Sequence, residues 1–463
     1  MQEYHIYKLK YFDLQDRLNL FPPDFDFNID FGYLLMHFVI EQMANRIEKS
    51  KFSNIYEEYN PLNSEILQSY NRGYRNHIRY LCDNFPNIGN IFERRDYDKG
   101  RSYSYRFRPY YRDRQLEPYL ITDKILIKKL RKNNQPKISE EAQKKCPFLI
   151  GYFDEKRLTI QFQEALDLNA DMLEEEGNIK KYLSSAFKIL KIKNGKYYMS
   201  HDPQTDGRFH SNITGFPKDF RKFLRYDGEK MAEIDISASV PTFLYYNLIN
   251  YQSTTKHIES IINKKSYYIH YMLVKNTGSP DNKEIQEFGA KILGGELYAS
   301  FTPKLEEHYV ALDDSYHQWQ WNEYFFPEGS FKNYDKKPRP KKPTLKESKN
   351  AMLSMFNAKN GCYAIEELSF KSIYPTIFEF LTSFKKPKHN YFSQLTLQTE
   401  SYFMLEIIAR RLSNKFKKKI PFFTLHDCIV ITESNLNTVF DFMKTTFEAE
   451  LGFVPVLNPK LWD

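Results

Sequence analysis

MAEIDIS, residues 231–237, alternates apolar and polar side chains in the middle of this chain. Glu233, Asp235 and Ser237 therefore share one face, and the alternation predicts a half-buried β-strand. The residues that follow, SASVPTFLYYNLIN, supply serines that can cap a helix and Pro241 for its first turn. The sequence thus places Asp235 near the carboxyl end of a strand that leads directly into a helix.

A second carboxylate, Asp427, lies in a predicted hairpin near the end of the sequence. Two short apolar runs, Ile420–Leu425 and Ile429–Thr432, flank His426 and Asp427. Apolar runs joined by a short polar turn are typical of antiparallel strands. The surrounding pattern predicts a helix from about Gln398, a later helix that ends at Gly452, and a short strand over Phe453–Val456.

Metal-assisted phosphoryl transfer is the chemistry that Asp235 and Asp427 could perform together. Two divalent ions can activate a hydroxyl and stabilise a leaving group, and Mg²⁺ prefers carboxylate oxygens while retaining several waters. Carboxylates near strand ends are common, and these two are far apart in the sequence. Only a sheet that places their strands side by side would bring them to one metal site.

Several stretches in the same order, over about residues 200–460, resemble the family A DNA polymerases, the bacterial polymerase I group. TDGRFHSN, residues 205–212, is similar to the TGRLSS stretch of that family, and EIDISASVP falls at its first palm motif. LQTES, residues 397–401, resembles the QGTAAD region. TLHDCIVIT, residues 424–432, is similar to the VHDE motif, or to its HDS version in single-subunit phage-type RNA polymerases.

The resemblance implies an α+β fold with polymerase right-hand architecture: an antiparallel-sheet palm, helical fingers and a mixed, aromatic-rich N-terminal region. It also implies that Asp235 and Asp427 are catalytic and hold two Mg²⁺ ions, for which Mn²⁺ could substitute, with the backbone carbonyl of Ile236. The implied nucleic-acid contacts are Arg208, Arg221, Gln398 and His426. The implied contacts to the incoming dNTP or NTP are Lys349, Lys346, Arg208, Val240 and Phe356.

Each of these roles has a structural alternative. Arg208 could be a surface cation, Gln398 a polar residue at a helix start, and His426 a turn residue. The fingers stretch LKESKNAMLSMFNAKN does not reproduce the family's spacing of a basic residue, a lysine and a tyrosine, so Lys349 and Lys346 both remain candidates for the triphosphate. A solvated basic helix face is the alternative for both lysines.

Two palm positions also depart from the family's pattern. Val240 stands where the DNA polymerases of the family place a glutamate that excludes ribose, so the choice of sugar is open. Cys428 replaces the acidic residue that usually follows the palm His-Asp. A cysteine in this setting is expected to pack and not to bind metal.

Shifts in composition near residues 130–142 and 327–349 suggest boundaries between domains. The first 200 residues show no clustered acidic exonuclease pattern. The expected division is an N-terminal basic and aromatic nucleic-acid-binding region (1–135), a thumb-like or connecting region (136–204), the first part of the palm (205–250), a fingers-like helical region with a basic, Pro-rich loop at 335–343 (251–395), and the second part of the palm (396–463).

The charge balance suits a polyanionic partner, with 67 Lys and Arg against 59 Asp and Glu and a net charge of +8. The block RRDYDKGRSYSYRFRPYYRDR, residues 94–114, interleaves cations with rings, which suits either a groove for phosphates and stacked bases or a solvated hairpin. The four cysteines form no CxxC pair, and no uncharged apolar run is long enough to span a membrane. We therefore expect a cytoplasmic protein without membrane partners.

These features together predict a nucleotidyltransferase. We expect a polymerase that extends a 3′-hydroxyl on a primer-template or single-stranded template, with a lean to DNA synthesis. An RNA polymerase, a primase or an untemplated, defence-type polymerase would have the same fold. A metal-dependent nuclease and a catalytically inactive nucleic-acid-binding protein are the alternatives of another class.

Overall fold

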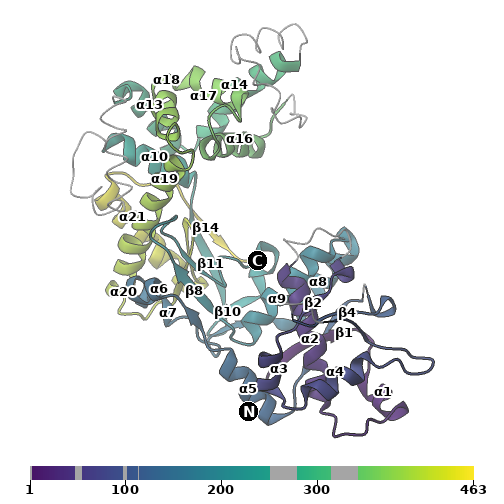
Figure 1. Ribbon diagram of the computed structural model, residues 1–463. Coiled ribbons are helices and arrows are strands. Elements are labelled where there is room, and N and C mark those ends of the chain that lie inside the picture. The colour runs from purple at the N-terminus through teal and green to yellow at the C-terminus, as the bar shows by residue number, and fades with distance from the viewer. Residues whose placement is uncertain (1–2, 47–54, 97–101, 113, 251–278, 314–341) are drawn as a thin grey trace.

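The computed structural model describes residues 3–46, 55–96, 102–112, 114–250, 279–313 and 342–463. Within these residues helices and strands are mixed, and the buried apolar side chains form three hydrophobic cores. Figure 1 shows an N-terminal lobe and a helical lobe at opposite ends, with a sheet between them. No helix in the described ranges is long and apolar enough to cross a membrane.

The N-terminal lobe is built around the buried helix α2, and its core also takes in residues from the later helix α9. The sequence pattern predicts a helix over Tyr33–Lys49, and α2 confirms it as far as Arg46, with a start one turn earlier; residues 47–49 lie outside the described residues. Two small sheets, β1-β5 and β2-β4-β3, cover the helix. The elements are β1 (His5–Leu9), α1 (Leu14–Leu20), α2 (Ile29–Arg46), η2 (Ile55–Glu57), β2 (Asn60–Pro61), α3 (Ser64–Tyr70), α4 (Tyr74–Cys82), β3 (Phe92–Arg95), β4 (Ser104–Phe107), η3 (Pro109–Tyr111), β5 (Leu116–Leu120) and α5 (Lys124–Asn133).

The segment that follows the N-terminal lobe contributes to two cores. Residues of α9 pack in the N-terminal lobe, whereas β7, β8 and β9 pack with the central sheet. The helices α8 and α9 lie against each other. The elements are β6 (Lys137–Ile138), α6 (Glu140–Lys145), α7 (Pro147–Ile150), β7 (Leu158–Ile160), α8 (Phe162–Glu176), α9 (Ile179–Lys193), β8 (Tyr198–His201), β9 (Phe209–Ser211), η4 (Lys218–Phe223) and β10 (Leu224–Tyr226).

The central sheet has the strand order β12-β13-β11-β10-β7. The first residues of β11 pair with β10, and its later residues pair with β14. All its pairings are antiparallel. The predicted strand at MAEIDIS is confirmed as β11 (Glu229–Ile236), in which Ala232, Ile234 and Ile236 are buried and Glu233 and Asp235 are half-buried. The predicted helix after it is α10 (Ser239–Ile249), and the predicted hairpin is β12 (Phe422–Leu425) with β13 (Cys428–Thr432).

The helical lobe is inserted between α10 and the hairpin. Its core joins these helices to the apolar face of α10, and α10 also packs against α19, which returns the chain to the sheet. The helices are α13 (Asn282–Leu293), α14 (Leu297–Asp313), α16 (Leu345–Asn357), α17 (Ala364–Ile373), α18 (Pro375–Lys385) and α19 (Tyr391–Ser401). Residues 335–341 of the basic, Pro-rich loop lie outside the described residues.

Two predicted boundaries near the end of the chain are wrong. The helix expected from about Gln398 begins at Tyr391 as α19 and continues through the π-helix η6 (Tyr402–Ala409) into α20 (Arg410–Lys415). Its first turns pack on the helical lobe and its later turns on the sheet, so no single apolar stripe marks its length. The strand expected over Phe453–Val456 is instead β14 (Leu457–Leu461), which follows α21 (Leu436–Leu451).

Candidate active site

The central sheet places Asp235 and Asp427 on neighbouring strands. Asp235 lies opposite Cys428 in the antiparallel pair of β11 and β13, and Cys428 directly follows Asp427. The main-chain N–H of Ile236 donates to the carbonyl oxygen of Asp427 over 3.2 Å. The two aspartates, far apart in the sequence, therefore lie at the same end of two hydrogen-bonded strands.

The turn that carries Asp427 has an uncommon backbone. His426 and Asp427 join β12 to β13, and His426 has a φ of 56°. A positive φ at the first of two loop residues is typical of type II′ hairpin turns, where glycine is the usual residue because a side chain is strained there. A non-glycine residue held in this conformation is often found at functional sites.

Asp235 is repelled by the negative charges of neighbouring carboxylates. Burial, followed by the charges of Asp427 and Glu233, raises the pKa of Asp235 to about 6. Burial also raises the pKa of Asp427, although Arg208 and Lys349 oppose the rise. Mutual repulsion between half-buried carboxylates is relieved when a cation binds between them, so the two oxygen-donor groups fit a hard divalent ion.

The fit is to an ion that keeps much of its water. Among the described residues no cluster of three or more His, Cys, Asp or Glu side chains has a metal-binding arrangement. A hard divalent ion held by Asp235 and Asp427 alone would need water or a bound ligand to complete its coordination shell.

Of the two candidate lysines on α16, Lys349 is the one that acts on the aspartates. Its charge lowers the pKa of both Asp235 and Asp427, and its ammonium lies 5.9 Å from the centre of the Tyr298 ring. Lys346 is exposed one turn earlier on α16. Lys218, which the sequence reasoning missed, also lowers the pKa of Asp235. Nothing in the pattern around Lys218 distinguishes it from other surface lysines.

Arg208 is held by a buried glutamate that the sequence reasoning also missed. Glu400 is 1% exposed, and its Oε1 accepts from Nε and Nη2 of Arg208 over 2.8 and 2.5 Å. Its Oε2 accepts from the Ser239 hydroxyl over 2.7 Å. Burial, opposed by Arg208, raises the pKa of Glu400 to about 7, and the charge of Asp427 contributes. The only sequence signal was its place within the LQTES stretch.

Gln398 lies inside the protein, in the body of α19. Its Nε2 donates to the carbonyl oxygen of Thr205 over 3.0 Å, and Ser401 donates to the carbonyl oxygen of Gly207. Gly207 has a φ of 69°, and a Cβ there would lie 3.2 Å from the Ser401 hydroxyl. Helix α19 therefore holds the loop that leads to Arg208 through two hydrogen bonds. Gln398 lies in the body of this helix and not at its start.

His426 is half-buried in the hairpin turn beside Asp427. Burial, and then the charges of Arg208 and His210, lower the pKa of His426 to about 4, so the ring is neutral at pH 7. Its ring meets that of His210 edge to face at 5.9 Å. A neutral imidazole can hydrogen-bond a phosphate but adds no charge to its binding.

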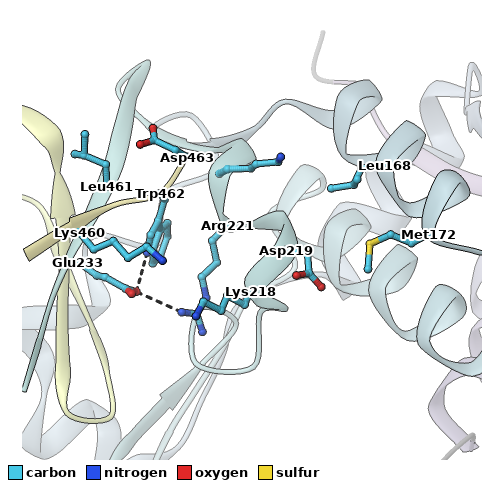
Figure 2. Close-up of a pocket in the computed structure, with 11 residues that line it drawn as sticks. Leu168, Met172, Lys218, Asp219, Arg221, Glu233, Lys460, Leu461, Trp462 and Asp463 are labelled. Atoms are coloured by element: carbon cyan, nitrogen blue, oxygen red, sulfur yellow. Dashed lines mark hydrogen bonds and ion pairs between the residues drawn. The ribbon is translucent and has the colours of Figure 1, made fainter. Parts of the chain in front are cut away.

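Arg221 lies beside a pocket of about 390 Å³ between α8, η4 and the end of the chain. Figure 2 shows Arg221 and Trp462 converging on Glu233 from either side. Arg221 donates to Glu233 over 3.3 Å and the Trp462 indole donates over 2.7 Å to the same oxygen. Lys218, Lys222 and Lys460 also line this pocket.

The two remaining residues of the nucleotide-contact prediction, Val240 and Phe356, differ in burial. Val240 is partly buried and packs against the core of the helical lobe, five residues after Asp235. Phe356 is fully buried, with its ring edge to face against Phe370 and Phe392. Phe356 therefore packs in the core of the helical lobe, and its contact with a nucleotide stays a prediction.

The Arg/Tyr block lies in the N-terminal lobe, where β3 and β4 form a hairpin. Its cations pack on rings within the lobe: Arg94 over Tyr103, Arg95 and Arg106 over Tyr59, and Arg114 over Tyr110. The hairpin reading thus accounts for the described residues of the block, whereas residues 97–101 and 113 lie outside them. A role in binding nucleic acid stays a prediction.

Comparison with known proteins leaves the family open. No family model matches the chain, and no curated protein is similar to it. Among solved structures, the POL domain of Pol1 from M. smegmatis, in complex with DNA primer-template and dNTP, is similar over 64% of this chain at 9% sequence identity and a TM-score of 0.25. The similarity spans 56% of that structure's chain.

Proposed function

We propose that this protein is a nucleic-acid polymerase that adds nucleotides to a 3′-hydroxyl by two-metal nucleotidyl transfer. The observation that carries the proposal is the placement of Asp235 and Asp427 at the same end of two hydrogen-bonded antiparallel strands. In this proposal the central sheet is the palm of a right hand and the helical lobe supplies the fingers. The collinear motifs in the sequence support the same assignment.

Asp235 and Asp427 would hold the metal ions, with the carbonyl of Ile236 as a further donor. When bound, Mg²⁺ ions would activate the 3′-hydroxyl as a nucleophile and stabilise the charge on the departing pyrophosphate. The two carboxylates contribute their negative charge and their fixed spacing on the sheet. Because the pKa of Asp235 is about 6, its carboxyl group is mostly deprotonated at neutral pH and can bind a cation.

Lys349 would neutralise the triphosphate of the incoming nucleotide. Its charge lowers the pKa of both aspartates, and a cation beside the triphosphate would balance the negative charge of the transition state. Arg208 and His426 would contact the substrate strand. Val240 stands where the resemblance places a glutamate that excludes ribose, so we propose DNA synthesis as the main activity with weak exclusion of ribose.

Extension of a labelled primer tests the proposal. DNA and RNA templates are each offered with Mg²⁺ and either dNTPs or NTPs, with a reaction without primer alongside. Wild type is compared with Asp235→Asn and Asp427→Asn, which preserve side-chain shape. Asp441→Asn, an exposed aspartate on α21, is the matched control.

We expect template-dependent extension by wild type and Asp441→Asn, and none by the two site variants, while all four proteins bind the primer-template equally. Shortening of the primer that depends on Asp427 would replace the polymerase with a nuclease. Binding without extension or shortening under any condition would leave a nucleic-acid-binding protein without catalytic activity.

A further inference from the structure

Glu400 is the most deeply buried carboxylate near the candidate metal site, and three separate segments meet at it. It belongs to α19, its partner Arg208 immediately precedes β9, and Ser239 begins α10, four residues after Asp235. Both oxygens of Glu400 are therefore used within the protein. A buried carboxylate that is fully engaged in this way has little capacity left to bind a ligand of its own.

Arg208 has a second acidic neighbour. Its charge lowers the pKa of Asp427, and the charge of Asp427 in turn raises that of Glu400. The charge of Arg208 also lowers the pKa of Asp206, which His210 already contacts over 3.2 Å. Among the carboxylates that the guanidinium influences, Glu400 is hydrogen-bonded to it and Asp427 is the one assigned to metal. An arginine that paired directly with Asp427 would compete with a divalent cation for the same oxygens.

The backbone around Arg208 favours the pairing with Glu400. Helix α19 holds the preceding loop through Gln398 and Ser401, at Thr205 and Gly207. These contacts place Arg208 next to Glu400, which also belongs to α19. Glu400 can then accept from two nitrogens of the guanidinium, which fixes its plane as well as its position.

We propose that Glu400 is a positioning residue: by holding the Arg208 guanidinium, it keeps this arginine from pairing with Asp427 and leaves Asp427 free to bind a divalent cation. The inference rests on the metal site of the proposed function. It gives Glu400 a role in metal affinity although Glu400 does not touch the metal. The ligand concerned is a hard divalent cation, for which Mn²⁺ is the probe.

Mn²⁺ binding, followed by the loss of the free-ion EPR signal, tests this role without any catalytic turnover. The variants are Glu400→Gln, Arg208→Gln and the double variant R208Q/E400Q. Glu406→Gln is the matched control, because Glu406 pairs with Arg410 over 2.7 Å on the following turns of the same continuous helix. Asp427→Asn shows which part of the binding belongs to the candidate site.

We expect E400Q to weaken Mn²⁺ binding about tenfold, because the freed Arg208 would then pair with Asp427. We expect R208Q/E400Q to recover most of this affinity, because the competing cation is gone, and Glu406→Gln to bind like wild type. A merely structural role for Glu400 would predict no recovery in the double variant. Unchanged affinity in E400Q, or a loss that R208Q does not reverse, would overturn the inference.

Two further outcomes separate the inference from the function beneath it. If wild type shows no binding that Asp427→Asn removes, the metal site itself is wrong, and the inference falls with it. If E400Q does not fold, as judged by circular dichroism, Glu400→Met replaces it, because methionine is similar in length but offers Arg208 no charged acceptor. Wild-type affinity in Glu400→Met would overturn the inference.

Discussion

The main-chain N–H of Ile236 donates a hydrogen bond of 3.2 Å to the carbonyl oxygen of Asp427. This bond joins the two strands one residue beyond Asp235, and neither aspartate side chain takes part in it. The spacing of the two carboxylates is therefore set by the backbone of the sheet. Variants that remove the charge of either aspartate should keep the fold and change only the electrostatics of the site.

Removing the charge of Asp235 should stabilise the metal-free protein at neutral pH. The pKa of Asp235 is raised from 3.8 to about 6, so the folded protein binds this proton more tightly than the unfolded chain does. The resulting stability is present at low pH and is lost as the pH rises from about 4 through about 6. We expect Asp235→Asn to raise the melting temperature by about 1 to 3 °C at pH 7.5 in EDTA.

Thermal melts at pH 7.5 and pH 4.5 check this prediction, with Asp441→Asn as the exposed control. The gain from Asp235→Asn should shrink at pH 4.5, where the wild-type carboxyl is also protonated. A stability difference that is the same at both pH values would contradict the crowding of carboxylates at the site.

Metal affinity should fall as the pH is lowered through about 6. A proton and a divalent ion compete for the Asp235 carboxylate, whose pKa is raised to about 6 by burial and then by Asp427 and Glu233. Mn²⁺ titrations at pH 7.5, 6.5 and 5.5 measure the effect. Asp235→Asn should bind more weakly and with a shallower dependence on pH, and equal affinities for wild type at all three pH values would count against the assignment.

Lys349 and Lys346 should differ sharply although they lie one turn apart. Of these two lysines, Lys349 is the one whose charge lowers the pKa of both aspartates. We expect Lys349→Met to lower kcat/KM for the incoming nucleotide by about 100-fold, whereas Lys346→Met stays within about twofold of wild type. Steady-state primer extension with one limiting nucleotide measures both. The reverse order would move the triphosphate to the other lysine.

Gly207→Ala should destabilise the protein more than Gly228→Ala. Both glycines have a positive φ, 69° and 83°, but a Cβ at Gly207 would meet Ser401 whereas one at Gly228 would meet nothing within 4 Å. We expect about 1 kcal/mol for Gly228→Ala from backbone strain and about 2 to 3 kcal/mol for Gly207→Ala.

Urea unfolding of the two alanine variants gives this comparison. Gly207→Ala should also impair extension, because the loop that leads to Arg208 would be displaced from α19. Equal costs for the two variants would show that α19 does not hold this loop closely.

The sequence was sufficient to predict β11, α10 and the hairpin of β12 and β13, because their signals are local. Strict alternation, capping residues and two apolar runs around a polar pair each depend on a few neighbouring residues. The start of α19 and the position of β14 could not be predicted in this way. They depend on which core each turn of the helix meets and on where the chain after α21 reaches the edge of β11.

The site was only partly predictable for a similar reason. Asp235 and Asp427 stood out because strand patterns surround them, whereas Glu400 and Lys218 acquire their surroundings only when distant segments meet. The burial of Phe356 could not be predicted either, because α16 changes environment along its length. Lys349 and Phe356 lie two turns apart on one face, but the first is exposed and the second is covered by Phe370 and Phe392.

The hydrogen bond between Ser239 and Glu400 joins the two helices that connect the helical lobe to the sheet. Helices α10 and α19 carry the chain into and out of the helical lobe, and they pack side by side where they meet the sheet. Ser239 and Glu400 tie these two stems together within a few residues of the metal-site strands. The helical lobe is thus connected to the sheet through two helices that are joined to each other. A rotation of the lobe would shift Asp235 through α10 and Arg208 through α19.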